Sequence, residues 1–204
     1  MEIKVLPLGH IKANCYLISS KEAAVVIDAG FYSPKVCEFL QANSDKQRLI
    51  LLTHAHFDHI GGAERLRNET GVKIAIGEKD NEDLSNPYKN LSDKFHAHIT
   101  PFSADILLKH GERISVGDIE FKVIHTPGHT VGGVCYLTGD ILFSGDTLFY
   151  RSVGRTDFDG GDYSELMYSI KELFKLPDNT TVLSGHGIET TIGQEKLYNP
   201  FINF

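Results

Sequence analysis

The chain has 204 residues, 41% of them hydrophobic, which is enough to bury a sizeable core in one domain. Its formal net charge is −7. This balance argues against nucleic acid or an anionic membrane surface as the partner, because both attract clustered Lys and Arg. No stretch approaches the roughly 18 apolar residues of a membrane-spanning helix. We therefore expect one domain over residues 1–204, with neither nucleic acid nor a membrane as its main partner.

The chain has three cysteines, an odd number, with no C-x-x-C pair: Cys15, Cys37 and Cys135. Such a set is typical of reduced thiols that are mostly buried. The first residues lack a long apolar run followed by a small-residue cleavage site, so we expect no secretion signal. Together these features predict a cytoplasmic protein.

The first predicted elements are three short strands and a helix. The strands are rich in β-branched residues and cover residues 3–8, 15–19 and 24–27. Ser33 offers an N-cap and Pro34 suits the first helical position, so a helix is predicted to about Ala42.

Residues 48–76 predict a strand, a loop, a helix and a second strand. The apolar run at 48–53 is typical of a strand buried on both faces. A helix over residues 62–70 would end at Gly71, and residues 72–76 form the next strand. Between the first strand and the helix lies a dense group of polar side chains.

The second half of the chain is predicted to contain a polar excursion, a meander of strands, and then a helix followed by a last strand. Residues 78–110 are predicted to be a long loop with one short helix near 78–84. Strands are predicted over 113–116, 120–125, 134–137 and 141–144, with turns at Gly117 and Gly139. Asp162 and Glu165 form a capping pattern for a helix to about Phe174, with a buried stripe of Leu166, Ile170, Leu173 and Phe174. A last strand is expected over 180–183.

The dense polar group contains four metal-ligand residues within six positions: His54, His56, Asp58 and His59. Imidazole and carboxylate ligands without a thiolate suit a divalent ion such as zinc. A single polar residue in a turn is more often an ordinary surface residue than a ligand. The density of this group reverses that preference and predicts a metal site.

Three later residues extend the group: His129, Asp146 and His186. Each follows a predicted strand and lies in a glycine-containing turn, where side chains converge at one edge of a sheet. Seven ligands exceed the four that one tetrahedral zinc needs. Shared between two ions with one bridging carboxylate, they predict a two-metal site that holds a hydroxide nucleophile. The other histidines, His10, His96, His98, His110 and His125, are expected at the surface.

These residues bring the chain close to a known family. The motifs THAHFDHIGG (53–62), TPGHT (126–130), SGDTLF (144–149), GRTDF (154–158) and SGHG (184–187) resemble those of the metallo-β-lactamase superfamily over nearly the whole chain. An aspartate at position 146 resembles the glyoxalase II branch (hydroxyacylglutathione hydrolases). The resemblance implies an α/β (α+β) fold, a four-layer αββα sandwich of two facing sheets with helices outside.

The resemblance also implies roles for the site residues. His54, His56 and His129 would bind the first ion, Asp58, His59 and His186 the second, and Asp146 would bridge them. Asp58 and Asp146 would act with the bridging hydroxide in catalysis. Asp28 would orient a ligating histidine rather than bind metal. The expected cofactors are two divalent metal ions, zinc first, with iron or manganese as alternatives.

The implied activity is hydrolysis of an anionic thioester such as S-lactoylglutathione. The chain ends soon after His186, so the C-terminal helical domain with which glyoxalase II holds glutathione is not expected. Arg155 could take the role of a lysine of that enzyme and bind a substrate carboxylate, or it could form a structural ion pair with Asp157 or a neighbour. Phe149, Tyr150 and Arg151 are candidates for the pocket lining.

Two other enzyme readings stay open. A persulfide dioxygenase of the same fold would use one iron, held by His54 or His56 with His129 and Asp146. A hydrolase acting on a different ester or a lactone would use the same two-metal site. Neither reading involves nucleic acid or a membrane, and the oligomeric state is not predicted.

Overall fold

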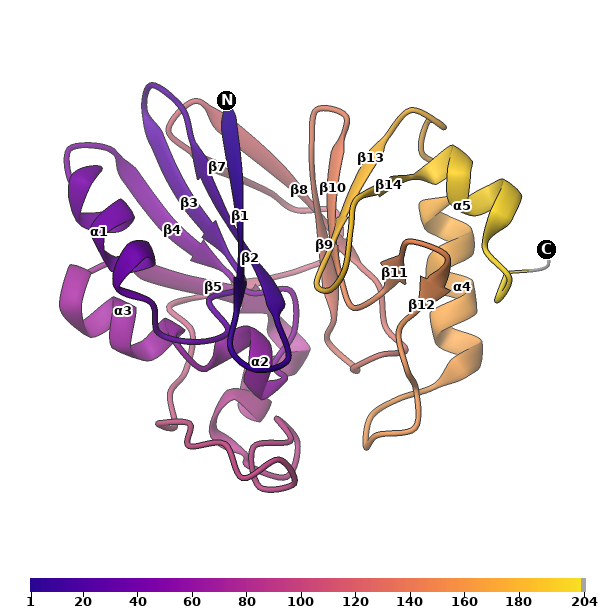
Figure 1. The fold of residues 1–204 in the computed structure, drawn as a ribbon, viewed down its shortest axis with the longest axis horizontal. Helices are drawn as coiled ribbons and strands as arrows, with labels where there is room; N and C mark the ends of the chain where they lie inside the picture. The colour runs from indigo at the N-terminus through magenta and orange to yellow at the C-terminus, as the bar shows by residue number, and fades with distance from the viewer. Residues whose placement is uncertain (203–204) are drawn as a thin grey trace.

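The computed structural model of this protein describes residues 1–202. Two six-stranded sheets face each other, and helices cover their outer sides (Figure 1). Helices α1 (Pro34–Ala42) and α3 (Ala63–Thr70) lie outside the first sheet, and α4 (Tyr163–Leu173) and α5 (Ile192–Tyr198) lie outside the second. This architecture confirms the predicted four-layer αββα sandwich.

The first sheet combines an antiparallel edge with a parallel centre. Its order is β1 (Glu2–Leu8), β2 (Ala13–Ser19), β3 (Ala23–Ile27), β4 (Gln47–Leu51), β5 (Lys73–Gly77) and β6 (Ile106–Leu108). Strands β1 to β3 pair antiparallel and β3 to β6 pair parallel. All five residues of β3 are buried, as expected for a parallel strand covered on both faces.

The second sheet is mainly a meander. Its order is β14 (Thr190–Thr191), β13 (Thr181–Ser184), β10 (Ile141–Gly145), β9 (Val134–Thr138), β8 (Ile119–His125) and β7 (Arg113–Val116). Gly117 and Gly139 have φ of 55° and 57° at two of its turns, a conformation that favours glycine. A separate two-stranded ribbon, β11 (Leu148–Phe149) with β12 (Ser152–Val153), follows β10.

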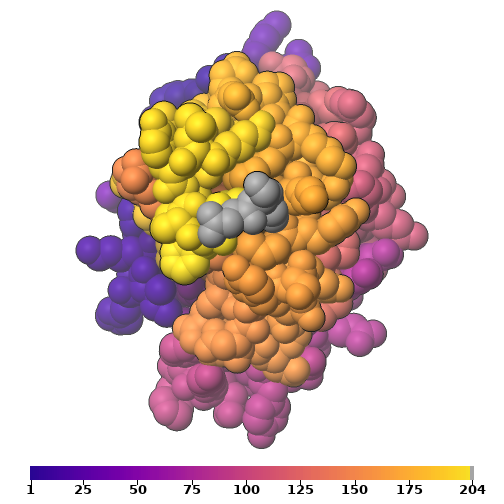
Figure 2. Space-filling model, turned by 90° about the vertical axis from the view of Figure 1, so that its right-hand side faces the viewer, coloured from indigo at the N-terminus to yellow at the C-terminus, as the bar shows by residue number. Residues whose placement is uncertain are grey.

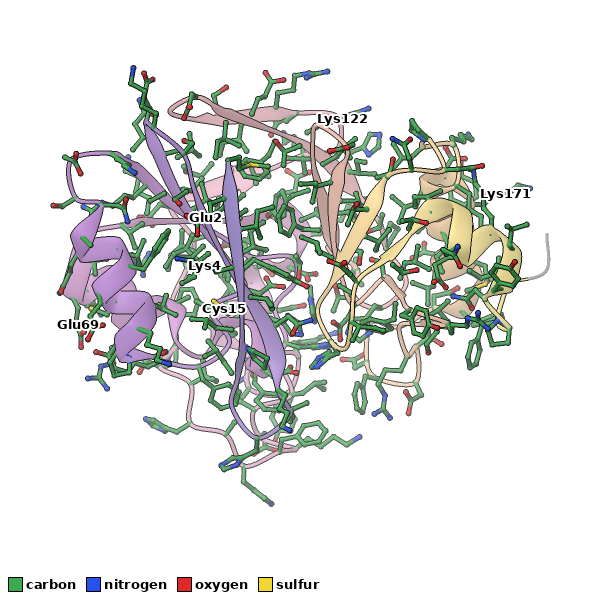
Figure 3. The ribbon with its side chains drawn as sticks, turned by 45° about the horizontal axis from the view of Figure 1, so that its top comes forward. Glu2, Lys4, Cys15, Glu69, Lys122 and Lys171 are labelled. Atoms are coloured by element: carbon green, nitrogen blue, oxygen red, sulfur yellow. The ribbon has the colours of Figure 1, made fainter. Side chains whose placement is uncertain are left out.

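Three apolar clusters hold the layers together. The cluster between the sheets includes the large side chains Phe121, Tyr136 and Phe143. A second joins α1 and α3 to the first sheet, and a third joins α4 and α5 to the second. Figure 3 shows Glu69 on α3 and Lys171 on α4, on opposite outer faces of the molecule.

Local sequence signals set several helix ends. Pro34 occupies the first turn of α1, Gly71 caps α3 in the left-handed conformation, and the Asp162 side chain accepts a hydrogen bond from the Glu165 amide at the start of α4. In the predicted stripe of α4, Leu166, Ile170 and Leu173 are buried. Phe174 is only half-buried, because it lies at the C-cap where the chain leaves the helix.

The polar excursion was predicted wrongly in two respects. It contains two short 3₁₀ helices, η1 (Glu78–Asp80) and η2 (Glu82–Ser85), where one helix was expected. It also contains β6, whose three residues pair in parallel with β5, and such a short strand carries almost no periodic signal. The excursion projects below the face formed by α4 and α5 (Figure 2). Within residues 1–202, no helix has the length and apolar character needed to cross a bilayer.

Candidate metal centre

The predicted ligands converge because their strands end at one edge of the sandwich. The group from His54 to His59 follows β4 and includes the short helix α2 (Phe57–Ile60), whereas the other three ligands follow β8, β10 and β13. These last strands run in the same direction, since β9 lies antiparallel between β8 and β10, and β13 is parallel to β10. Several polar contacts join the sheets at this edge, and two of them come from the backbone of Asn14 and the side chain of Tyr16. The Asn14 amide donates to the Gly185 carbonyl at 2.7 Å, and the Tyr16 hydroxyl donates to the Ser184 carbonyl at 2.6 Å.

All seven predicted ligands come together. Their ligand atoms form three groups, each with its atoms within 4.8 Å of one another: His54, His56 and His129; His54, His59 and Asp146; and Asp58, His59 and His186. The rings of His54, His56 and His129 lie with centroids 4.6 to 4.9 Å apart. His54 and His59 each belong to two of the groups and so link them, and His186 Nε2 lies 3.6 Å from Asp146 Oδ2.

The buried imidazoles present their Nε2 atoms to the centre. His129 donates its Nδ1 proton to the Arg155 carbonyl at 2.8 Å, and His59 Nδ1 lies 2.9 Å from Asp28 Oδ2. The Thr53 hydroxyl donates to Asp28 and therefore accepts from His54 Nδ1 at 3.0 Å. At His54 and His129, the proton on Nδ1 leaves Nε2 with a free lone pair, the form that ligates metal.

Several ring nitrogens and a carboxylate oxygen at the centre lack hydrogen-bond partners among the described residues. The Nε2 atoms of His54, His56, His59 and His129 and the Oδ1 of Asp146 are buried without one. Buried polar atoms are normally satisfied, so five unsatisfied ones facing each other fit positive ions at this place. Nitrogen and carboxylate donors are ligands that zinc, iron and manganese all accept.

The pKa shifts of the histidines fall into two kinds. Burial and the neighbouring imidazoles hold the pKa of His54 and His56 well below the usual value, so both rings are neutral at pH 7. Burial also opposes a charge on His59. The carboxylates of Asp146, Asp58 and Asp28 outweigh it and raise the pKa of His59 to about 10.

The carboxylate of Asp58 is shifted in the opposite sense. Burial opposes its ionisation, but the adjacent His59 and His186 hold its pKa well below the usual range. Asp58 is therefore ionised at neutral pH. Before metal binds, His59 is protonated and neutralises part of the surrounding negative charge.

Two glycines allow the loops to approach closely. A Cβ on Gly185 would lie 2.1 Å from Asp146 Oδ1 and 2.7 Å from His59 Cε1, inside the space of the ligands. Gly145 has φ of 49°, and a Cβ there would lie 2.5 Å from the Thr53 hydroxyl. Side chains at either position would displace the ligands.

Asp80 is a buried site residue that the sequence reasoning missed. Its carboxylate accepts hydrogen bonds from the Ala55 amide at 3.2 Å, the Thr130 hydroxyl at 2.8 Å and the Gly132 amide at 2.5 Å. It thereby ties the loop of His54 and His56 to the loop of His129. Burial raises the pKa of Asp80 to about 6. Its position in a polar stretch gave no sign of this role.

Arg155 takes the second of its two predicted arrangements. Its guanidinium pairs with Asp157 through two contacts of 2.7 Å, and it also lines the cleft described below. Of the predicted pocket residues, Phe149 lines this cleft, whereas Tyr150 and Arg151 are not part of its described lining. The remaining five histidines lie outside the three ligand groups. Four are exposed and His125 is half-buried.

A cleft of about 420 Å³ opens over the centre. Its polar lining includes His56, Asp58, His129, Asp146 and His186, and the rest is largely apolar. The ligands are therefore reachable from solvent by a small molecule, in keeping with the concave, mostly apolar character of ligand sites.

Comparisons with known proteins agree with this centre. A model of the metallo-β-lactamase superfamily matches residues 8–186. The probable metallo-hydrolase YqgX of Bacillus subtilis is 35% identical over 207 residues, which cover 100% of this chain and 98% of that protein. The hydroxyacylglutathione hydrolase GloC of Haemophilus influenzae is 34% identical over 209 residues, which cover 100% and 99%.

Solved structures match over the same length. The B3 metallo-β-lactamase BLEG-1 is 40% identical, with a TM-score of 0.90 over 98% of this chain and 99% of that one. TTHA1623 in a di-iron-bound form is 34% identical, with a TM-score of 0.88 over 98% and 100%. ETHE1 from Myxococcus xanthus is 32% identical, with a TM-score of 0.78 over 98% and 84%.

The fold and the clustered ligands define a metal-binding protein of the αββα class. The matches over nearly the full chain place it further: the chain belongs to the metallo-β-lactamase superfamily. The resemblance seen in the sequence motifs is confirmed. Membership of this superfamily supports metal-dependent hydrolysis as the general class of activity.

Proposed function

We propose that the protein is a two-metal hydrolase of thioesters, of which S-lactoylglutathione is one example. The observation that carries this proposal is the convergence of seven imidazole and carboxylate side chains in three overlapping groups, within which four buried Nε2 atoms and Asp146 Oδ1 have no hydrogen-bond partner among the described residues. One ion would occupy only part of this set. The similarity to GloC, a hydroxyacylglutathione hydrolase, supports the substrate class.

In this proposal, His54, His56 and His129 would hold one ion, Asp58, His59 and His186 would hold the other, and Asp146 would be a ligand shared by the two. When bound, the two ions, zinc first with iron or manganese as alternatives, supply a hydroxide nucleophile at neutral pH and polarise the acyl carbonyl. The ionised Asp58 would accept a hydrogen bond from this hydroxide and so orient it.

Other residues keep the ligands in place. The Arg155 carbonyl fixes the ring of His129, and Asp28 fixes that of His59. The Arg155 guanidinium is the proposed contact for an anionic group of the substrate. It would bind that group while keeping its ion pair with Asp157. We expect Arg155→Ala to raise KM if that contact is made and to leave KM unchanged if the ion pair is purely structural.

Metal analysis together with two assays tests the proposal. We expect about two ions per chain and hydrolysis of S-lactoylglutathione. Asp146→Ala should lower kcat by at least roughly 100-fold, the scale on which an electrostatic contact in the transition state is lost. Asp118→Ala, at an exposed turn remote from the ligands, is the matched control. Near-normal turnover by Asp146→Ala would refute the assignment.

The competing function is a mononuclear iron persulfide dioxygenase, for which the similarity to ETHE1 is the relevant observation. It would need His129, Asp146 and one of His54 or His56. That arrangement leaves the group of Asp58, His59 and His186 without a role. One iron per chain with oxygen uptake on glutathione persulfide, and without thioester turnover, would replace our proposal with this one.

A further inference from the structure

The cleft over the metal centre has an apolar side that the proposed chemistry does not use. Phe57, Leu91, Phe95, Phe149 and Phe158 are among its lining residues. They come from α2, from the polar excursion, from β11 and from the segment after β12. Hydrolysis of the acyl bond needs only the polar residues at the bottom of the cleft, so the apolar side must be explained separately.

Three of these side chains form a continuous surface, here called the aromatic wall: Phe57, Phe95 and Phe158. The rings of Phe57 and Phe95 stack with centroids 5.0 Å apart, and Phe158 meets Phe95 edge-on at 6.2 Å. Phe158 also lies 6.1 Å from the ring of His56. The wall therefore runs from a proposed ligand of the first ion out to solvent, where Phe95 is 44% exposed.

The wall is held in place by contacts on both sides. The Phe57 amide donates to the Asn90 carbonyl at 2.8 Å, and the Phe95 amide donates to the Leu91 carbonyl at 3.1 Å. Leu91 has φ of 65°, a conformation that L residues rarely adopt and that persists where surrounding contacts demand it. The excursion thus presents Phe95 to the cleft from a fixed backbone.

Phe158 is fixed both by a backbone hydrogen bond, which its carbonyl accepts from the Gly161 amide at 2.9 Å, and by two cations. The guanidinium of Arg155 lies 3.8 Å from its ring centroid and the ammonium of Lys94 lies 4.3 Å from it. Cation–π contacts of this kind orient an aromatic ring. Arg155 therefore supports the wall whether or not it also contacts the substrate.

The size of the cleft sets the size of the group that would cover the wall. A volume of about 420 Å³ falls in the range of sites for organic ligands. A lactoyl group is too small and too polar to cover such a surface, and exposed apolar side chains beside a reactive centre gain free energy only from an apolar ligand.

We propose that the aromatic wall is a subsite for the acyl group, and that the preferred substrates are thioesters of apolar acids of medium length, such as hexanoyl or benzoyl thioesters. This inference rests on the proposed thioester hydrolysis and specifies its substrate. The acyl carbon would lie at the ligands, and the chain would extend along Phe158 and Phe95 away from His56.

The test is a series of acetyl, butyryl and hexanoyl thioesters of one small thiol, N-acetylcysteamine, with metal-loaded protein. Each kcat/KM is divided by the rate constant for hydroxide-catalysed hydrolysis of the same thioester, which removes differences in intrinsic reactivity. A buried methylene contributes up to about fourfold, so partial burial of four methylenes should raise the corrected kcat/KM at least roughly tenfold from acetyl to hexanoyl.

Two variants separate the wall from its surroundings. Phe95→Ala, at a half-exposed position, should reduce the hexanoyl-to-acetyl ratio to about three or less. Tyr88→Ala removes an exposed aromatic side chain of the same excursion that does not line the cleft, and should keep the wild-type ratio.

A binding measurement without turnover tests the same subsite independently. The inert S-hexyl thioether of the same thiol should bind wild-type protein more tightly than the S-ethyl thioether, and Phe95→Ala should abolish the difference.

The outcomes are distinguishable from failure of the proposed function. If no thioester is hydrolysed by protein that holds two ions, the proposed function itself fails. If thioesters are hydrolysed with a flat or falling acyl profile, or if Phe95→Ala keeps the wild-type ratio, the acyl subsite is refuted and thioester hydrolysis stands. In a companion series, the acyl group is held constant as acetyl and the thiol is enlarged with apolar groups; if the corrected kcat/KM rises with the size of the thiol and Phe95→Ala abolishes that rise, the wall binds the leaving group and our assignment is overturned.

Discussion

The replacement of Asp28 by asparagine tests how the centre orients its histidines. Asp28 Oδ1 accepts from the Thr53 amide at 2.8 Å. Its Oδ2 accepts from the Thr53 hydroxyl at 2.7 Å and lies 2.9 Å from His59 Nδ1. Asparagine keeps one oxygen, so Asp28→Asn preserves the first contact and turns an NH₂ group toward the other two. The shape of the site changes little, but the pattern of donors is reversed.

The reversed donors act on two imidazoles. His59 can accept from the new amide only through Nδ1, which moves its proton to Nε2, the atom that must ligate. The Thr53 hydroxyl then accepts from the amide and its proton turns toward His54 Nδ1, which in the wild type is the donor. Loss of such supporting contacts weakens metal affinity by about 10- to 100-fold, or ~1.4–2.7 kcal/mol.

The assay is competition for zinc with a chromophoric chelator, which resolves the two binding steps. We expect Asp28→Asn to weaken the step that uses His59 most strongly. Asp105→Asn is the control, because Asp105 also accepts from a backbone amide, that of Ile74, but touches no ligand. If Asp28→Asn stays folded by circular dichroism and both zinc affinities remain within about threefold of wild type, the tautomer argument is wrong.

Three further predictions concern the fold and its ionisable groups. Asp80→Ala leaves three buried donors unsatisfied and should lower the free energy of unfolding by about 3 kcal/mol in urea, whereas the exposed Asp93→Ala should change it by less than about 0.5 kcal/mol. A loss below 1 kcal/mol for Asp80→Ala would contradict that role. Because the folded pKa of His59 is raised to about 10, its contribution to the stability of metal-free protein is full below about pH 6.5 and is lost as the pH rises toward 10. For the same reason zinc uptake at pH 7.5 should release a proton from His59, seen by calorimetry in buffers of different ionisation enthalpy, and zinc uptake without proton release would refute the shift. Finally, burial raises the pKa of the thiols of Cys15, Cys37 and Cys135. A disulfide reagent such as DTNB should therefore label none of these thiols within minutes in native protein and all of them in urea. Rapid labelling of the native protein would contradict their burial.

Helix ends and most strands could be predicted from the sequence because their causes are local. Pro34, Gly71 and the Asp162–Glu165 pair act within one turn of a helix, and each is found in its predicted place. The strand β6 and the helix α5 were not predicted. β6 has three residues and exists because β5 offers a parallel edge, and such pairing leaves almost no trace in a short segment.

The residues of the candidate site likewise fall into those with a local sequence signal and those without one. The cluster from His54 to His59 was visible because its members are neighbours in the chain, and the glycine turns around His129, Asp146 and His186 marked the rest. The sequence left two arrangements open for Arg155, and the structure shows its ion pair with Asp157. No local pattern pointed to Asp80, whose partners lie 25 to 52 residues away.

The sequence by itself determined the types of ligand at the centre, since ligand types and their spacing along one loop are properties of the chain. It also determined the superfamily, through motifs that record those ligands. Only the tertiary structure decided how the loops of two different sheets meet, which ring nitrogens face the centre, and that Phe57, Phe95 and Phe158 form a wall beside it. The physical reason is that contacts between distant segments depend on the packing of whole layers, which no short stretch of sequence encodes.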